Sequence, residues 1–247
     1  MNILVTGASS GFGKSICQRL VSDGHHVVGF ARRAEKLAVL KEQLGEQFTP
    51  ISCDVTDFSS VDKAFSELPE GSIDVLVNNA GLALGLEGMQ DLAVSDWTTM
   101  INTNINGLVY FTQKVLPTMI AQNSGLIINM GSIAGTYPYP GGNIYGATKA
   151  FVKQFSLNLR TDLLGTQVRV TNIEPGLCGE TEFSNVRFKG DDGKAAKVYE
   201  NTKYIMPEDI ASTVAFLVSQ PAHVNYNRIE MMPVSQASAP LAVHRQK

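Results

Sequence analysis

Apolar and polar positions along the chain follow two alternating patterns. Short continuous apolar runs, such as residues 2–6 and 26–31, are typical of strands that are buried on both faces. Between them, apolar residues recur every three or four positions, as Phe12, Ile16 and Leu20 do, which predicts amphipathic helices. Strands that alternate with helices of this length predict right-handed βαβ units around one parallel sheet.

The same reading extends along the whole chain. The predicted strands lie at residues 2–6, 26–31, 48–53, 73–77, 125–130, 167–173 and 225–232. The predicted helices lie at residues 10–23, 34–44, 57–68, 95–122, 143–164 and 207–218. We expect Gly24 to end the first helix as a C-cap and Pro117 to lie near a bend. No linker divides the pattern, so we expect residues 1–247 to form one domain, with a mobile lid or short helices over the polar residues 179–204.

Composition and charge exclude several classes of protein. Of the 247 residues, 44% are apolar and 17% charged, which excludes a disordered chain. A net charge of −3 favours neither nucleic acid nor an anionic membrane as a partner, and no apolar run approaches the ~20 residues of a membrane span. The strand at residues 2–6 leaves no room for a signal peptide, and the sparse Cys17, Cys53 and Cys178 predict a reducing, cytoplasmic location. No group of His, Cys and carboxylate residues has zinc-site spacing, so we expect no metal.

A glycine-rich turn follows the first predicted strand and begins the first predicted helix. Its glycines would let the backbone approach a pyrophosphate, which the N–H groups and positive dipole end of the helix would bind. The residues concerned are Gly7, Ser9, Ser10, Gly11, Phe12 and Gly13. The span 7–11 also fits the nucleophile elbow of a hydrolase, G-x-S-x-G. That mechanism requires a late histidine at a strand end, and neither His223 nor His244 follows a clear strand, so we favour phosphate binding.

The end of the second predicted strand indicates which dinucleotide binds. An NAD site requires an acidic residue there for the ribose 2′-hydroxyl, and the chain has Arg32 and Arg33 instead. Two guanidinium groups suit a 2′-phosphate, which predicts NADP. Asp54 and Val55, after the third strand, are then expected beside the adenine.

A tyrosine followed four residues later by a lysine places both side chains on one helix face. The chain contains this spacing at Tyr110/Lys114, Tyr145/Lys149 and Tyr199/Lys203, so spacing alone does not select a pair. The middle pair begins a predicted helix just after Ser132, which follows the fifth strand. Ligands of open α/β sheets bind at the carboxyl ends of the strands, where Thr6, Asn79, Ser132 and Pro175 are expected, so we select Tyr145 and Lys149.

These residue types suit hydride transfer to or from a carbonyl carbon. A phenol has a pKa of about 10, and a neighbouring ammonium and the positive nicotinamide ring both favour its ionised form. We expect Lys149 to supply a large share of that effect on Tyr145, while the Ser132 hydroxyl holds the substrate oxygen. Asn104 could hold a water that connects Lys149 to solvent, or could instead be a structural amide inside a helix.

Taken together, these motifs resemble the short-chain dehydrogenase/reductase family over essentially the whole chain. The resemblance rests on residues 6–13, 78–81, Asn104, Ser132, Tyr145-x-x-x-Lys149 and residues 175–176, in the family's order. Residues 141–151, 156–162 and 174–191 more narrowly resemble bacterial NADP-dependent 3-hydroxy acid dehydrogenases, which act on serine, L-allo-threonine and 3-hydroxypropionate or malonic semialdehyde. The resemblance implies a Rossmann-type, doubly wound domain with a seven-stranded parallel sheet of order 3-2-1-4-5-6-7.

The resemblance also implies NADP as cofactor, a homotetramer, and a catalytic tetrad of Ser132, Tyr145, Lys149 and Asn104. Further cofactor contacts that it implies are Asn79, Ala80, Gly81, Pro175, Gly176, Leu177, Cys178 and Thr181. Thr181 lies six residues after Pro175, one more than in many family members.

A 3-hydroxy acid is an anion, and a dry pocket must pair its charge. Arg187, in the polar segment, is our candidate for binding the substrate carboxylate, and Lys189 is the second choice. Two other interpretations stay open at this point. One is a reductase of the same family that acts on an uncharged ketone or pteridine, and the other is a non-catalytic, NADP-sensing regulator.

Overall fold

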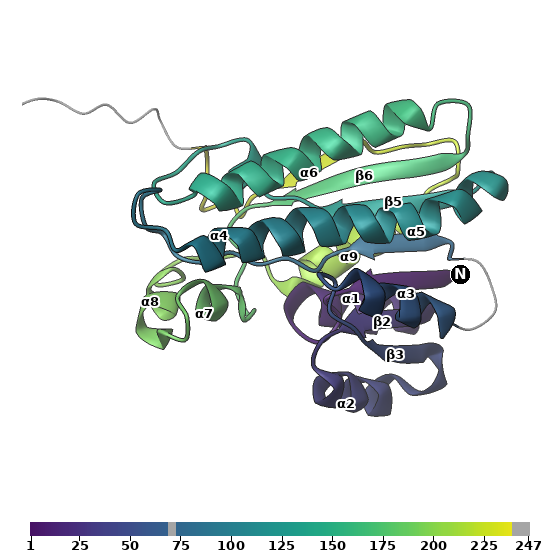
Figure 1. Cartoon of the computed structure of the whole chain (residues 1–247), viewed down its shortest axis with the longest axis horizontal. Coiled ribbons are helices and arrows are strands. Elements are labelled where there is room, and N and C mark those ends of the chain that lie inside the picture. The colour runs from purple at the N-terminus through teal and green to yellow at the C-terminus, as the bar shows by residue number, and fades with distance from the viewer. Residues whose placement is uncertain (69–72, 239–247) are drawn as a thin grey trace, which may run out of the picture.

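A parallel sheet of seven strands forms the centre of the molecule, with helices on both faces (Figure 1). The structure is a computed structural model that describes residues 1–68 and 73–238. The strands are β1 (Asn2–Thr6), β2 (His26–Ala31), β3 (Phe48–Ser52), β4 (Val75–Asn78), β5 (Gly125–Met130), β6 (Val168–Pro175) and β7 (Arg228–Met231). They lie in the order β3-β2-β1-β4-β5-β6-β7, which confirms the predicted Rossmann-type arrangement.

Each of the strands β1 to β6 contributes to two cores, which explains their apolar sequences. In β1, Ile3 and Val5 are fully buried on one face, while Leu4 between them is fully buried on the other. The first core packs against α1 (Gly11–Ser22), α2 (Ala34–Leu44) and α9 (Pro207–Ser219). The second packs against α3 (Phe58–Ser66), α5 (Leu108–Ala121) and α6 (Asn143–Asp162). Each fully buried Leu or Ile contributes about 1.5–3 kcal/mol, so both layers hold the sheet in place.

The predicted helix over residues 95–122 is divided by a change in hydrogen bonding. It consists of α4 (Val94–Ile101), a π-helical segment at Asn102–Gly107, and α5. The irregularity was expected near Pro117, which instead lies inside α5. π-Helical turns are frequent at functional sites because the wider turn redirects side chains, and this one carries Asn104.

Other boundaries shift by a few residues for identifiable reasons. Gly24 has a φ of 85° just after α1, the left-handed conformation expected of a glycine at a helix end. Asp57 precedes α3 and caps it by accepting hydrogen bonds from Ser59 N and Ser60 N. Strand β7 begins later than predicted because the side-chain amide of Asn225, rather than its backbone, hydrogen-bonds the N–H and carbonyl groups of Val170.

The polar stretch at residues 179–204 contains two short helices, α7 (Phe183–Arg187) and α8 (Asp192–Lys197). Both lie beyond the carboxyl ends of the strands (Figure 1). An isolated bridge between Cys178 and Ile205 joins the two ends of this stretch. We call residues 179–204 the lid. Two 3-10 turns, at Gly45–Gln47 and Ile133–Gly135, complete the elements of the described residues. Among the described residues, no helix is long and apolar enough to cross a membrane.

Candidate active site

The turn between β1 and α1 is built for a close approach of backbone to ligand. Gly7 and Gly11 have φ angles of 69° and 49°, which favour glycine. A Cβ on Gly13 would lie 2.2 Å from the Gly7 carbonyl oxygen, so only glycine lets α1 pack against the turn. The side chain of Ser10, the residue before α1, makes no capping bond, so it does not occupy the N–H groups of the first turn.

Thr6 ties this turn to the end of the neighbouring strand β4. Its hydroxyl accepts hydrogen bonds from Asn79 N at 3.0 Å and Ala80 N at 2.9 Å. The Asn79 amide in turn donates to the Thr6 carbonyl at 2.9 Å. Residues 79–81 are thereby held at the carboxyl edge of the sheet, where the sequence placed them.

Arg33 lies at the far end of the same edge and makes a set of polar contacts. Its Nη2 donates to Ser10 Oγ at 2.8 Å and to Ser9 Oγ at 3.2 Å, and its Nη1 pairs with Glu182 at 2.8 Å. Lys36 binds the other oxygen of Glu182. Because Ser9 contacts a guanidinium, which cannot accept a proton, the hydrolase interpretation of the glycine-rich turn is not supported. His244, which that interpretation also considered, lies outside the described residues.

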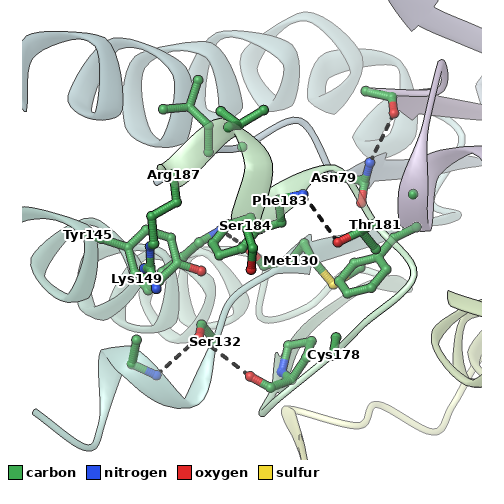
Figure 2. A pocket seen from close by; sticks show the side chains of 18 of the residues that line it. Asn79, Met130, Ser132, Tyr145, Lys149, Cys178, Thr181, Phe183, Ser184 and Arg187 are labelled. Carbon is green, nitrogen blue, oxygen red and sulfur yellow. Dashed lines mark hydrogen bonds between the residues drawn. The ribbon is translucent and has the colours of Figure 1, made fainter. Parts of the chain in front are cut away.

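Tyr145 and Lys149 begin α6 and face the edge of the sheet beside Ser132 (Figure 2). The Ser132 hydroxyl accepts from Ala134 N at 3.1 Å and donates to the Pro175 carbonyl at 3.4 Å, so the ends of β5 and β6 position it. Lys149 is only 6% exposed, and its Nζ donates to the Met130 carbonyl at 2.7 Å. The Nζ lies 5.8 Å from the centre of the Tyr145 ring.

Burial shifts the pKa values of both residues of this pair. Burial raises the pKa of the Tyr145 hydroxyl to about 12, and the contacts that oppose this come from Ser132 and Arg187. Burial also lowers the pKa of the Lys149 ammonium to about 8. Lys149 was expected to supply a large share of the acidity of Tyr145; its Nζ donates to the Met130 carbonyl, and that role stays a prediction.

Asn104 supports this pair from behind and does not line the cavity. Its amide nitrogen donates to the Leu82 carbonyl at 2.9 Å and to Thr148 Oγ1 at 3.1 Å, and its oxygen accepts from Leu82 N at 2.9 Å. The side chain is therefore committed to structure, which favours the structural alternative for its amide. A role in holding a water for Lys149 stays a prediction.

The other two tyrosine–lysine pairs have different surroundings. Tyr110 donates to Asp62 at 2.8 Å, and Lys114 pairs with the same carboxylate at 2.9 Å, so this pair forms a surface cluster. Tyr199 hydrogen-bonds the Ser184 hydroxyl at 2.6 Å and packs the lid. The pair Tyr145/Lys149 is distinguished from these two pairs by its position at the carboxyl edge of the sheet.

Arg187 reaches from the end of α7 onto the Tyr145 ring (Figure 2). Its guanidinium carbon lies 5.1 Å from the centres of the Tyr145 and Phe183 rings, and its Nη2 donates to the Tyr139 hydroxyl at 2.7 Å. Within the described residues, its buried Nε has no hydrogen-bond partner. Lys189, the second choice for the substrate carboxylate, is instead paired with Asp96 at 2.7 Å and does not line the cavity.

A single cavity of about 570 Å³ joins these regions. It is lined by nearly all of the predicted residues: Gly7, Ser9, Ser10, Gly11, Phe12, Arg32, Arg33, Asp54, Val55, Asn79, Ala80, Gly81, Ser132, Tyr145, Lys149, Pro175, Gly176, Leu177, Cys178, Thr181 and Arg187. Gly13 and Asn104 are the exceptions, because both support the lining residues from behind. The cavity has a glycine-rich turn and cations at one end and a tyrosine, a serine and a lysine at the other, which suits a dinucleotide and a small substrate.

Comparison with known proteins agrees with this geometry. The sequence profile of the short chain dehydrogenases matches residues 1–192. The chain belongs to the short-chain dehydrogenase family. The resemblance that the motifs indicated is thereby confirmed.

Individual relatives match over their whole length. The NADP-dependent 3-hydroxy acid dehydrogenase of Escherichia coli K12 is 57% identical over 248 residues, which are 100% of both chains. The serine 3-dehydrogenase of Agrobacterium fabrum is 49% identical over 246 residues, 99% of this chain and 98% of its own. A solved structure of the closed form of serine dehydrogenase with NADP+ has a TM-score of 0.98 at 57% identity and covers 100% of both chains.

Sequence reasoning missed several residues of this short-chain dehydrogenase site, among them Tyr139, Glu182 and Phe183, which line the cavity, and Lys36, which binds Glu182. Lys36 lies three residues after Arg33, and that spacing at a helix start could have placed both cations on one face. Glu182 lies 146 residues from Lys36 in sequence, and no local pattern connects the two. Among the described residues, no group of three or more His, Cys, Asp or Glu side chains could hold a metal ion.

Proposed function

We propose that this short-chain dehydrogenase uses NADP to oxidise a small 3-hydroxy acid, or to reduce the corresponding 3-oxo acid. Serine, L-allo-threonine and the pair 3-hydroxypropionate/malonic semialdehyde are the substrates to consider. The observation that carries the proposal is one cavity in which Ser132, Tyr145 and Lys149 lie beside a lid arginine, with Arg32 and Arg33 at the other end. The names and identities of the relatives support the same substrate class.

In the oxidation direction, Tyr145 Oη takes the proton from the substrate hydroxyl while Ser132 Oγ holds the same oxygen. NADP, when bound, supplies the hydride acceptor and a positively charged ring that favours the ionised phenol. Lys149 would hold the ribose of the cofactor and pass the proton toward solvent. In the reduction direction, Tyr145 donates its proton to the oxygen that becomes the alcohol.

Arg187 would bind the substrate carboxylate. Within the described residues its buried Nε has no hydrogen-bond partner, and the rings of Tyr139, Tyr145 and Phe183 surround a guanidinium that lines the cavity as a charged donor. A carboxylate would satisfy that donor with a charge-assisted hydrogen bond. Because this cation faces the pocket, an uncharged ketone or pteridine is the less favoured substrate.

Arg32 and Arg33 support NADP over NAD. In the protein alone, Arg33 is already fixed by the Ser9 and Ser10 hydroxyls, and Arg32 is exposed beside it in the same cavity. A planar guanidinium binds a phosphate through two hydrogen bonds, so both groups suit the 2′-phosphate.

The test is absorbance at 340 nm with a panel of hydroxy acids and neutral alcohols, each with NADP and NAD in parallel. We expect turnover of 3-hydroxypropionate, serine and L-allo-threonine with NADP and little with NAD. Equal use of the two cofactors would refute the role of the arginines. Turnover of neutral alcohols alone would refute the substrate class, and no turnover with any of them would favour the NADP-sensing regulator.

We further infer a homotetramer in the cytoplasm. Apolar side chains on α5 and α6 are exposed, among them Ile120 at 44% and Phe151 at 38%. Phe151 stacks on Phe155 with ring centres 5.8 Å apart, which extends the apolar face. Three free cysteines are consistent with a reducing compartment.

A further inference from the structure

Glu182 connects the lid to the opposite end of the cavity. One carboxylate oxygen accepts from Arg33 Nη1 at 2.8 Å, and the other binds Lys36 at the start of α2. Although partial burial raises it, the hydrogen bonds from Lys36 and Arg33 lower the pKa of the Glu182 carboxyl to about 2. The contact is therefore an ion pair between one anion and two cations at any pH where the protein would be assayed.

Glu182 is also the residue that immediately precedes α7, the helix that ends at Arg187. Its neighbour Thr181 rests on Gly11, whose Cβ would lie 3.2 Å from the threonine methyl. At the other end of α7, Arg187 binds Tyr139, and its carbonyl accepts from Gly85 N at 2.9 Å. The position of Arg187 over Tyr145 thus depends on a short helix whose first anchor is Glu182.

We propose that Glu182 is a positioning residue. It holds α7 against Arg33 and Lys36 at the start of α2 and so places Arg187 over the substrate pocket. The inference rests on the proposed function, because Arg187 is taken to bind the substrate carboxylate. If Glu182 acts in this way, the position of Arg187 at the substrate end of the cavity depends on Arg33 and Lys36, which lie at the end expected to bind the adenosine of the cofactor. Lys36, which lies on α2, then contributes to substrate binding through Glu182 alone.

The charges allow Glu182 and a 2′-phosphate to be held together. Arg32, Arg33 and Lys36 are three cations, and Glu182 neutralises only one of them. The charge that remains matches that of a phosphate monoester, about −1.5 to −2 at pH 7. Arg32, which is exposed in the same cavity, provides a guanidinium that Glu182 does not occupy. Glu182 therefore leaves room for NADP and does not compete with it for every cation.

The test is a double-mutant cycle with Glu182→Gln and Lys36→Met, measured on the full chain with saturating NADP. We expect each single variant to raise KM for 3-hydroxypropionate about tenfold, with a smaller change in kcat, and the double variant to be no worse than either single one. The Kd of NADP for Glu182→Gln should not rise, because the variant removes a negative charge near the phosphate. Glu180→Gln is the matched control, since it removes the same charge two residues away, and within the described residues the Glu180 carboxylate hydrogen-bonds the Tyr204 hydroxyl rather than Arg33 or Lys36.

A second measurement needs no turnover. Hydrogen exchange of residues 183–187 in the protein without ligands should be faster in Glu182→Gln and Lys36→Met, and unchanged in Glu180→Gln. If the native protein oxidises no hydroxy acid, the proposed function fails while this result still supports the anchoring of α7. Unchanged exchange, additive effects in the cycle, or a rise in the Kd of NADP with an unchanged KM for the acid would each overturn the proposal.

Discussion

At Tyr145, burial opposes the ionised form that proton transfer to and from a substrate requires. Burial raises the pKa of the Tyr145 hydroxyl to about 12, so the ionised form needs a nearby positive charge, which the oxidised nicotinamide ring of a bound cofactor would supply. A fall from 12 to about 7 corresponds to about 7 kcal/mol of differential stabilisation. Chemistry at this residue should therefore depend on the loaded site rather than on the protein fold alone.

Tyr145→Phe is expected to lose nearly all turnover, at least about a thousandfold in kcat, and to retain NADP binding because the ring keeps its shape. Steady-state rates and the Kd of NADP check this. Tyr110→Phe is the control, since the Tyr110 hydroxyl hydrogen-bonds the surface carboxylate of Asp62 away from the cavity, and it should leave kcat nearly unchanged. Substantial activity in Tyr145→Phe would remove this tyrosine from the mechanism.

Lys149 is the second residue at which function and stability conflict. Its native pKa of about 8 lies below the value of about 10.4 for an unfolded lysine, because the buried ammonium loses hydration. Between these values the unfolded state binds the additional proton, so stability of the native protein rises as the pH increases from 8 toward 10. Below pH 8, burial of the charged form reduces stability.

Lys149→Met should therefore stabilise the protein without ligands by about 1–2 kcal/mol at pH 7, after allowance for the lost bond to the Met130 carbonyl. The gain should shrink as the pH approaches 10. Urea unfolding at pH 7 and pH 9.5 measures both values. A variant that is equally destabilised at the two pH values would show that the hydrogen bond outweighs the cost of burying the charge.

At the scale of elements, α1 can reach the phosphate site only because Gly13 has no side chain. A methyl group there would overlap the Gly7 carbonyl, so the turn or the helix would have to move. Gly13→Ala is expected to lower the free energy of unfolding by about 3 kcal/mol and to weaken NADP binding at least tenfold. Gly193→Ala in α8 is the control, because a Cβ there meets only Asp191 at 3.5 Å. Denaturant unfolding and NADP titration of both variants distinguish a packing defect from a general effect of alanine.

The lid helix α7 presents Arg187, and the role of this residue can be separated from the shape of the lid. Arg187→Met should lower kcat/KM for 3-hydroxypropionate by about 2–4 kcal/mol of transition-state binding, roughly 30- to 1000-fold. With the neutral methyl ester of the same acid, the loss should be much smaller. Lys189→Met, which removes a lid charge outside the cavity, is the control. Equal losses of kcat/KM with the acid and the ester would mean that Arg187 shapes the lid but does not bind the substrate carboxylate.

At the scale of the whole molecule, the exposed apolar residues of α5 and α6 require an explanation that the single chain does not offer. We expect a tetrameric mass by light scattering at micromolar concentration. Phe151→Glu should shift the mass to smaller species, since it places a charge on the apolar face formed with Phe155. Val39→Glu on α2 is the control, an exposed apolar residue at 53% exposure on the opposite face of the sheet. A monomeric mass of the native protein would refute the tetramer.

The fold was predictable because it follows from local patterns. In β1, side chains alternate between the two faces of the sheet, so Ile3 and Val5 enter one core and Leu4 enters the other. Backbone geometry sets this alternation, and the apolar residues at these positions make it visible in the sequence. The glycines of the turn between β1 and α1 were likewise predictable, because close contacts within that one turn require residues without a side chain. The boundaries were less predictable, as at the π-helical segment around Asn104, because packing against Leu82 decides the hydrogen-bonding pattern there.

What the sequence by itself determined was the layered fold, the phosphate-binding turn and the pairing of a tyrosine with a lysine on one helix face. The sequence also selected Tyr145 from its place after the fifth strand, whereas the tertiary structure decided that Arg187 rather than Lys189 enters the cavity. It also brought Glu182 to Lys36 across 146 residues of chain. The physical reason is that local conformation depends on neighbouring residues, whereas contacts between distant segments depend on how every intervening element packs.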